Sequence, residues 1–325
     1  MLNMRYFFLT ILFLGLFVGV QIVLYQNYDS NKSEIDFDNI SSSIVKLETT
    51  TSRSSKNFGS GIIISQDGYI VTAYHLLRGA YNVSVNILGD KYDANIVGFD
   101  EYSDIAVIKV NASGLEPIQI ETKLDLKIGD QVYAIGNPFN VGISVSSGIL
   151  SATGRNFGNP YLDILQTDAS INKGNSGGAL VNSKGRLVGI NTSIATLSGG
   201  SDGVGFAIPS DKILSISEEI IKYGEVKRAW IGSLSFRPFI YTDKDNISQR
   251  ALLVISNEQK NNENGLINGD IITLIKDSEA IWSTLKASIN SITPGDSLEL
   301  EIIRDGKKQR VLIKTTEIPA RLLVP

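Results

Sequence analysis

Short apolar runs follow one another from about residue 43 to residue 208, and this feature limits the possible folds most. The runs are rich in Ile, Val and Tyr, and turn signals such as Asp67-Gly68 and Gly89-Asp90 separate them. No long helical pattern interrupts the series. Short strands at this spacing predict β-barrels or β-sandwiches. The predicted strands are 58–64, 69–73, 83–88, 94–99, 105–110, 131–135, 141–152, 179–181, 187–193 and 204–208.

The hydrophobic period changes to that of a helix directly after these strands. Isoleucines share one face of the segment 210–223, with Ser210 placed to cap its start and Gly224 to end it. A helix that closes a β domain and leads into a linker places the domain boundary at 224–228. About 100 residues remain, which suffices for one small domain.

The remaining segment mixes strands with one helix. Asp305-Gly306 predicts a hairpin turn between the last two strands. The predicted elements are strands 252–256, 270–275, 298–304 and 310–315 and a helix over 280–290.

An uncharged apolar run occupies residues 7–24. Its 18 residues span roughly 27 Å as a helix, close to the hydrocarbon thickness of a bilayer. Arg5 before the run favours a cytoplasmic N-terminus, with the rest of the chain across the membrane. A cleaved signal peptide is the alternative, but no small-residue cleavage site follows at 25–28. We therefore expect an uncleaved N-terminal membrane anchor over 1–27 and a polar tether over 28–42.

Composition leaves few routes to chemistry. The chain has no cysteine, one histidine and a net charge of −4. These values exclude disulfides, thiolate chemistry and Cys-built zinc sites, and they give no footprint for nucleic acid. We expect no metal and no cofactor. Nucleophilic catalysis by a serine with a histidine base remains.

One serine lies among glycines in Asp168-Ala-Ser-Ile-Asn-Lys-Gly-Asn-Ser-Gly-Gly-Ala-Leu180. Ser176 needs a base, and His75 at a strand end is the only imidazole available. A carboxylate usually holds such a base in one tautomer, and Asp104 lies at the start of an apolar strand. The order His, Asp, Ser is that of the chymotrypsin arrangement.

The glycines before and after the serine suggest an oxyanion hole, in which main-chain amides bind the negatively charged oxygen of the intermediate. The N–H groups of Gly174 and Ser176, which flank Asn175, can converge on one oxyanion, and each such donor lowers the barrier by roughly 3–4 kcal/mol. Each feature also has a structural explanation when taken alone. A surface histidine, a strand-capping aspartate or a plain glycine turn would account for them singly. Together, in this order, the three favour a catalytic site.

Several motifs resemble those of HtrA-type serine proteases, over about residues 43–223. The resemblance implies a chymotrypsin-like pair of β-barrels, with His75 as general base, Asp104 as its orienting group and Ser176 as nucleophile. It also implies a domain over 43–224 that hydrolyses peptide bonds through an acyl-enzyme, without a cofactor. The motifs are VTAYH (71–75), SDIAVIKV (103–110), AIGNPF (134–139), SGILSATGR (147–155), LQTDASIN (165–172), GNSGGALVN (174–182) and GVGFAIP (203–209).

The resemblance extends to substrate preference. Ser170, six residues before the nucleophile, stands where trypsin-like proteases carry an acid, so a basic P1 residue is not expected. Positions matching Ile171 and Ile194 narrow the S1 pocket in this family. We expect small or medium aliphatic P1 residues.

The segment 225–325 resembles an HtrA PDZ domain more loosely. Trp230, Ile231, Gly232 and Ser233 match the loop that binds a peptide's terminal carboxylate, and the segment from Asn264 to Ile272 resembles a further family motif. A polar stretch at 259–263 replaces the family's usual small residues. A domain that serves only for packing is the alternative.

One anchor, one protease domain and one PDZ domain resemble the DegS type of stress-sensor protease. That type implies a homotrimer in the periplasm, attached to the inner membrane. It also implies activation by C-termini of outer-membrane proteins and cleavage of a membrane-spanning anti-sigma factor. Activation in the family involves the loop over 155–163, which holds no basic residue after Arg155.

Two other classes of function stay open. A catalytically idle, membrane-tethered PDZ protein would keep the barrels only as a scaffold, but it has no physical reason to retain His75, Asp104, Ser176 and Gly174 together. A secreted trypsin-like protease would normally be stapled by disulfides, which a chain without cysteine cannot form.

Overall fold

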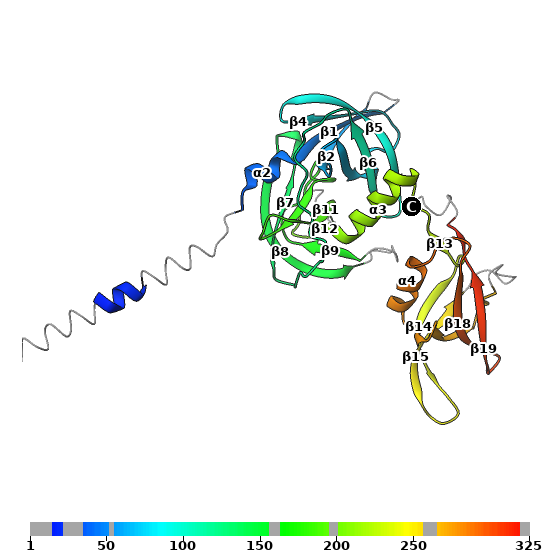
Figure 1. Ribbon diagram of the computed structural model, residues 1–325. Coiled ribbons are helices and arrows are strands. Elements are labelled where there is room, and N and C mark those ends of the chain that lie inside the picture. Colours follow the sequence, from blue (N-terminus) through cyan, green and yellow to red (C-terminus); the bar gives the residue numbers. More distant parts are fainter. Residues whose placement is uncertain are drawn as a thin grey trace, which may run out of the picture.

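The computed structural model describes residues 15–21, 35–51, 55–155, 163–194, 201–255 and 265–318 (Figure 1). Only residues 15–21 of the predicted anchor over 7–24 fall within these ranges, and they are helical. Among the described residues, no helix has both the length and the apolar character needed to cross a bilayer.

Twelve of the strands close into two antiparallel barrels, as the resemblance to HtrA-type proteases implied, whereas the strand spacing alone had left sandwiches open as well. The first has the order β1-β2-β3-β6-β5-β4 and the second β10-β11-β12-β9-β8-β7. The first consists of β1 (Ile44–Thr51), β2 (Lys56–Ile63), β3 (Tyr69–Ala73), β4 (Ala80–Ile87), β5 (Asp90–Asp100) and β6 (Ile105–Val110). The second consists of β7 (Gln131–Gly136), β8 (Ser144–Arg155), β9 (Ile164–Thr167), β10 (Ala179–Asn182), β11 (Leu187–Ile194) and β12 (Gly205–Pro209).

Strand β6 shows why parts of the sequence are continuously apolar instead of alternating. Ala106, Ile108 and Val110 fill the first barrel. Ile105 and Val107 point the other way and join a core built from both barrels. Because successive side chains of a strand face opposite sides, the part of β6 that is buried on both faces, residues 105–108, is apolar at every position.

Helix α3 (Ser210–Tyr223) closes the two-barrel unit, as the sequence predicted. Ile213, Ile216 and Ile220 pack into the core between the barrels, and Gly224 ends the helix in the left-handed region at φ 80°. The predicted cap was wrong: Pro209 is the N-cap residue, and its side chain makes no capping bond. Ser210 is fully buried, and its hydroxyl instead donates to the carbonyl of Glu121 at 2.7 Å.

A short helix, α2 (Phe37–Ser42), falls in the segment that the sequence predicted to be a tether. Asp36 caps it by accepting from the N–H of Asn39 at 3.0 Å. Ile40 is buried in the core between the barrels, and the ring of Phe37 meets Tyr133 edge-on at 5.0 Å. The end of the predicted tether is therefore packed against the barrels.

The C-terminal unit, residues 229–318, has its own core and one main sheet of order β14-β15-β16-β18-β19, with β17 beside β16. Arg304 pairs with Lys307, and Asp305 and Gly306 both have positive φ, which confirms the predicted hairpin turn. Its elements are β13 (Ala229–Trp230), β14 (Ser235–Thr242), β15 (Ser248–Ile255), β16 (Ile271–Ile275), β17 (Ser278–Glu279), α4 (Trp282–Asn290), β18 (Ser297–Arg304), β19 (Lys307–Lys314) and β20 (Thr316–Glu317).

The linker between the units lies against the first barrel. Glu225 forms a parallel bridge with Phe99 on β5, and a Cβ added to Gly98 would lie 2.0 Å from the carbonyl oxygen of Gly224. The guanidinium of Arg228 pairs with the carboxylate of Asp100, and their side chains are 14% and 5% exposed. The hydroxyl of Ser103 also donates to Asp100 at 2.5 Å. This buried ion pair therefore fixes the linker to the end of β5.

We expect Arg228→Ala to destabilise the two-barrel unit by about 3 kcal/mol, because it leaves a buried carboxylate without its cation. Urea unfolding should show a lower midpoint. Arg250→Ala is the control, since Arg250 and Glu279 form an exposed pair and should cost at most about 1 kcal/mol. Adding Asp100→Asn to Arg228→Ala should restore part of the loss. Equal midpoints for the two single variants would contradict the expectation.

Candidate active site

His75 lies on a short 3-10 turn, Tyr74–Leu76, that follows β3 directly. Its main-chain N–H donates to Asp104 Oδ1 at 2.8 Å, and its Nδ1 lies 2.8 Å from Asp104 Oδ2. The ring of Tyr74 stacks on Phe99 at 4.5 Å and steadies the turn. Burial raises the pKa of the Tyr74 phenol above its ordinary value, which disfavours the ionised form still further. The histidine side chain is 46% exposed and open to a substrate.

Asp104 reaches His75 because β3 and β6 are neighbours in the first barrel. Ala73 pairs with Ile105, so the residue after one strand meets the residue before the other. Asp104 has φ +56°, and aspartate is one of the few residues that tolerates this left-handed conformation. Its carbonyl accepts from the N–H of Tyr74 at 3.0 Å. The sequence prediction that His75 and Asp104 come together agrees with this geometry.

Thr192 on β11 is a member of the site that sequence reasoning missed. Its hydroxyl donates to Asp104 Oδ2 at 2.5 Å, and its carbonyl accepts from the hydroxyl of Ser176 at 2.9 Å. The residue thus contacts both the carboxylate and the serine. No motif distinguishes this threonine from others on the strands, and only the packing of the second barrel against the first reveals it.

The turn that carries Ser176 lies between β9 and β10 and requires its glycines for space as well as conformation. Gly174 and Gly177 have φ of +102° and +80°. A Cβ at Gly174 would lie 2.2 Å from the carbonyl oxygen of Asn137, and one at Gly178 would lie 2.3 Å from that of Ile135. Side chains at these positions would therefore clash with main chain. These contacts explain why the serine lies among glycines.

Two fixed carbonyls set the direction of the main-chain amides in this turn. The carbonyl of Lys173 accepts from the N–H of Phe139 at 2.8 Å, and that of Gly174 accepts from the hydroxyl of Ser60 at 2.8 Å. In a trans peptide the N–H points opposite to the carbonyl, so the N–H of Gly174 points away from Phe139. The amide of Asn175 donates to the carbonyl of Asn172 at 2.9 Å and is occupied. Asn175, which the sequence placed in the oxyanion hole between the two predicted donors, therefore offers no free amide.

Ser176 and His75 share no hydrogen bond in the described part of the chain, because the serine hydroxyl donates to Thr192 instead. In many enzymes the contact between nucleophile and base tightens only when substrate is bound. A rotation of the serine side chain would be needed to exchange one acceptor for the other.

The residues predicted to shape the S1 pocket lie on neighbouring segments of the second barrel. Ile171 is 1% exposed, and its Cδ1 would lie 2.7 Å from a Cβ at Gly205. Ile194 ends β11 and pairs with Gly205, but its side chain lies outside the described part of the structure. The carbonyl of Ser170 accepts from the hydroxyl of Ser146 at 2.8 Å. The absence of a side chain on Gly205 leaves the space that Ile171 occupies.

The residues predicted to bind a peptide carboxylate form a loop just before the edge strand β14. Trp230 lies on β13, Ile231 is 3% exposed, Gly232 has φ +102° and Ser233 is exposed. Among the described strands, β14 pairs only with β15, so no described strand lies along its other edge.

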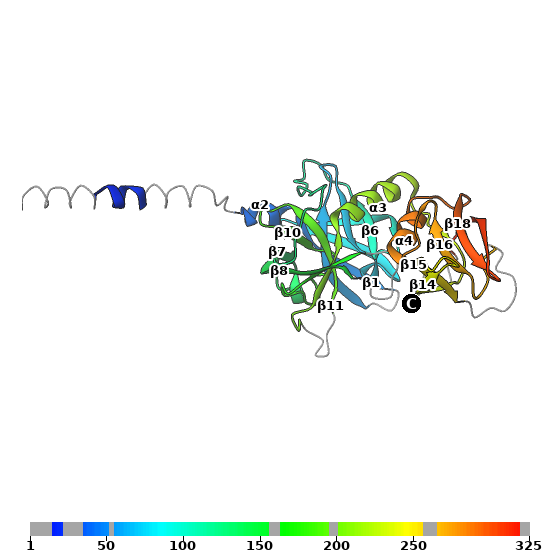
Figure 2. The same ribbon diagram turned by 90° about the horizontal axis from the view of Figure 1, so that it is seen from below.

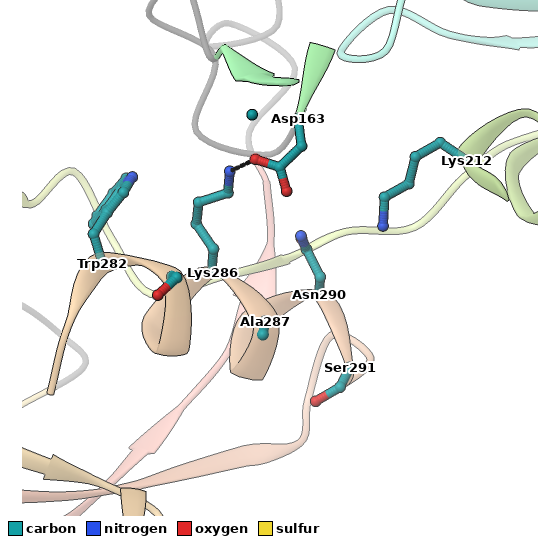
Figure 3. A pocket seen from close by; sticks show the side chains of 9 residues that line it. Asp163, Lys212, Trp282, Lys286, Ala287, Asn290 and Ser291 are labelled. Atoms are coloured by element: carbon teal, nitrogen blue, oxygen red, sulfur yellow. Dashed lines mark hydrogen bonds and ion pairs between the residues drawn. The ribbon is translucent and has the colours of Figure 1, made fainter. Parts of the chain in front are cut away.

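A cavity of about 520 Å³ separates helix α4 from the two-barrel unit (Figure 3). The amine of Lys286 lies 2.8 Å from Asp163 Oδ1, just before β9, and Lys212 of α3 extends into the same space. Figures 1 and 2 show α4 on the side of the C-terminal unit that faces the barrels. The cavity is lined by neither His75 nor Ser176.

The two closed barrels, with His75 and Asp104 on one and the Ser176 turn on the other, define a chymotrypsin-like protease domain. The family described as Trypsin-like peptidase domain matches residues 59–190. A Buchnera aphidicola (subsp. Schizaphis graminum) protein named Probable periplasmic serine endoprotease DegP-like is 40% identical over 267 residues, covering 79% of this chain and 56% of the relative. The Escherichia coli K12 Periplasmic serine endoprotease DegP is 39% identical over 269 residues, covering 78% and 56%.

The similar solved structures include HtrA-type proteases. HtrA-type protease AlgW with tripeptide superposes with a TM-score of 0.77 at 35% identity, covering 87% of this chain and 98% of that one. The chain therefore belongs to the HtrA-type serine proteases. It spans 56% of the length of the two DegP-named relatives.

Proposed function

We propose that this chain is a membrane-anchored periplasmic serine endopeptidase of the DegS type, whose activity responds to peptides bound by its C-terminal unit. The observation that carries the proposal is the contact between His75 and Asp104 beside the Ser176 turn, where the two barrels meet. The names of the relatives, which are periplasmic endoproteases, support the reaction and the compartment.

In the proposed mechanism, His75 removes the proton of Ser176 as its oxygen attacks the carbonyl carbon of the scissile peptide. Asp104 holds the histidine through two bonds and stabilises the imidazolium that forms. The N–H groups of Gly174 and Ser176 bind the oxyanion of the tetrahedral intermediate. The imidazolium then protonates the leaving amine. Water repeats the sequence on the acyl-enzyme and restores the serine.

We propose that Ile171 and Ile194 make the S1 pocket apolar and short. A buried isoleucine at its wall and no acid at Ser170 favour small or medium aliphatic side chains at P1. A basic P1 residue would have to lose its hydration without gaining a counter-charge there.

We propose that residues 225–325 form a PDZ domain. The loop from Trp230 to Ser233 and the open edge of β14 have the parts needed for a peptide to add as a strand with its carboxylate at the loop. The related HtrA-type protease AlgW has been solved with a tripeptide and with a decapeptide, which supports peptide binding here. By family resemblance, the peptides would be C-termini of outer-membrane proteins and the protease would be a homotrimer.

In the proposed regulation, a peptide bound to the C-terminal unit changes the activity of the protease domain through α4. The ion pair of Lys286 with Asp163 joins α4, which lies near the open edge of β14, to the segment that leads into β9. The proposed substrate is the periplasmic part of a membrane-spanning anti-sigma factor. An anchor over 1–27 would raise the effective concentration of such a substrate at the membrane.

The test uses the full chain in liposomes and a purified anti-sigma-factor periplasmic segment as substrate. A peptide ending in an outer-membrane-protein C-terminus should raise the cleavage rate about 5- to 150-fold, the usual range of allosteric coupling. The same peptide with an amidated C-terminus is the matched control and should have no effect. Mass spectrometry should place the cuts after aliphatic residues.

Each outcome of this experiment decides a separate part of the proposal. Cleavage that the peptide leaves unchanged would remove the regulatory role and keep the protease. Cuts after Arg or Lys would contradict the S1 assignment. No cleavage of any protein substrate, with peptide binding intact, would leave an idle peptide-binding protein.

A further inference from the structure

Ser60, on β2, donates both of its polar hydrogens to the Ser176 turn, although no sequence motif pointed to it. The residue is fully buried in the first barrel. Its N–H donates to the carbonyl of Ser176 at 2.9 Å, and its hydroxyl donates to the carbonyl of Gly174 at 2.8 Å. One side chain and one amide of the first barrel thus hold both carbonyls that flank Asn175.

The same hydroxyl also connects the turn to the second barrel. Ser60 Oγ accepts from the N–H of Asn137 at 2.9 Å, and Asn137 follows β7 directly. Two residues further, the N–H of Phe139 holds the carbonyl of Lys173. Both peptide planes that meet at Gly174 are therefore fixed by this short segment and Ser60.

This fixation matters because glycine allows a peptide plane to turn over. Gly174 has no side chain to limit its rotation, and its φ of +102° is one of several conformations open to glycine. A peptide plane held by its carbonyl cannot turn without breaking that hydrogen bond. The direction of the Gly174 amide thus depends on bonds made by other residues.

The site also spans two barrels, so the distance between base and nucleophile is set by contacts across the interface. His75 and Asp104 belong to the first barrel and Ser176 to the second. The hydrogen bonds from Ser60 to the carbonyls of Gly174 and Ser176 cross this interface and hold the main chain of the turn directly. An error of about 1 Å in such a placement can cost about 10²-fold in rate.

We infer that Ser60 is a positioning residue for the oxyanion-binding turn, an inference that rests on the proposed protease function. It contacts no substrate atom itself. Its bonds hold the 174–175 and 176–177 peptide planes, which lie on either side of the plane that carries the Ser176 amide. Through Asn137 it also supports the segment whose Phe139 amide fixes the plane of the Gly174 amide. By these contacts Ser60 keeps both amides directed at the developing oxyanion and holds the nucleophile at a fixed distance from His75.

The test compares Ser60→Ala with Ser210→Ala in the full chain. Ser210 is also fully buried and also donates to a main-chain carbonyl, but it lies on α3 and contacts Glu121. Ser60→Ala should lower kcat about 10²-fold, the lower end of the effect of losing one oxyanion donor, with KM nearly unchanged. Ser210→Ala should keep wild-type kcat. Both should lower the melting temperature, and Ser60→Ala should lower it more, because the Ser60 hydroxyl makes two buried hydrogen bonds and the Ser210 hydroxyl makes one.

A second readout separates positioning from a general loss of structure. A peptide boronic acid forms a tetrahedral adduct with the serine oxygen and uses the same amides as the oxyanion. Its affinity should fall about 10²-fold in Ser60→Ala, in parallel with kcat, whereas the affinity of a cleavage-product peptide should not change. Ser60→Cys retains a weak donor and should lie between the alanine variant and the wild type, which covers the case where Ser60→Ala does not fold.

Wild-type kcat and boronate affinity in Ser60→Ala or Ser60→Cys would overturn the inference and leave the protease assignment intact. Equal losses of kcat in the Ser60 and Ser210 variants would also overturn it, because they would show a purely structural effect. A wild-type chain that neither cleaves nor binds the boronic acid would overturn the proposed function, and this inference with it.

Discussion

Replacing Ser176 by alanine is expected to lower kcat by about 10⁶-fold, because it removes the hydroxyl that forms the acyl-enzyme in the proposed mechanism. His75→Ala should have nearly the same effect, since the chain contains no second imidazole. The double variant should be no slower than either single one, because the two residues act as a unit. Single-turnover cleavage of a peptide substrate with rapid quenching would measure all three.

As controls, the melting temperature and the affinity for a C-terminal peptide are measured for each variant. Ser176 is partly exposed at the interface of the barrels, and its hydroxyl makes one hydrogen bond, to Thr192. Alanine should therefore lower the melting temperature only by the small amount that the loss of this bond causes. Binding of a C-terminal peptide should also be unchanged. Residual kcat above one hundredth of the wild-type value would show that another residue is the nucleophile.

Asp104→Asn should lower kcat by about 10⁴-fold while leaving the fold intact. The carboxylate accepts from the histidine through Nδ1 and also accepts from the hydroxyl of Thr192. An amide directed at Nδ1 would donate instead of accept and would stabilise the wrong tautomer of the base. Thr192 cannot orient the histidine in place of Asp104, because its hydroxyl contacts the carboxylate that the substitution removes.

Asp130→Asn is the matched control for the aspartate series. Asp130 precedes β7 in the other barrel and accepts from the N–H of Lys127 at 2.8 Å, so its role is local. Its amide variant should keep wild-type kcat. If Asp104→Asn retained more than about one tenth of the wild-type kcat, the orienting role of Asp104 would be wrong.

Much of the fold could be predicted because its signals are local. The short apolar runs, the glycine after α3 and the Asp305-Gly306 turn are each readable from a few neighbouring residues. Strand β14 escaped because it is an edge strand whose side chains are mostly half-buried or exposed, so it lacks an apolar face. The capping role assigned to Ser210 failed because a buried carbonyl, that of Glu121, competes for its hydroxyl.

Some residues of the candidate site were likewise predictable from local patterns, and others were not. The motifs identify His75, Asp104 and Ser176, because each lies in a short pattern with a chemical reason for its residue types. Thr192 and Ser60 lie in strands whose patterns only indicate burial. Their roles arise from hydrogen bonds to residues 88 and 114 positions away in the chain.

Short-range sterics and side-chain chemistry act within a few residues, so the sequence specifies locally where strands form, where the glycine-rich turn lies and which three residue types acyl transfer requires. The closure of the strands into two barrels follows from their pairing in the folded chain. The same packing places the buried serine of the first barrel against the turn of the second, and Thr192 against Asp104. These features depend on register and on the packing of distant segments, and the free energy of such contacts appears only when the chain is folded.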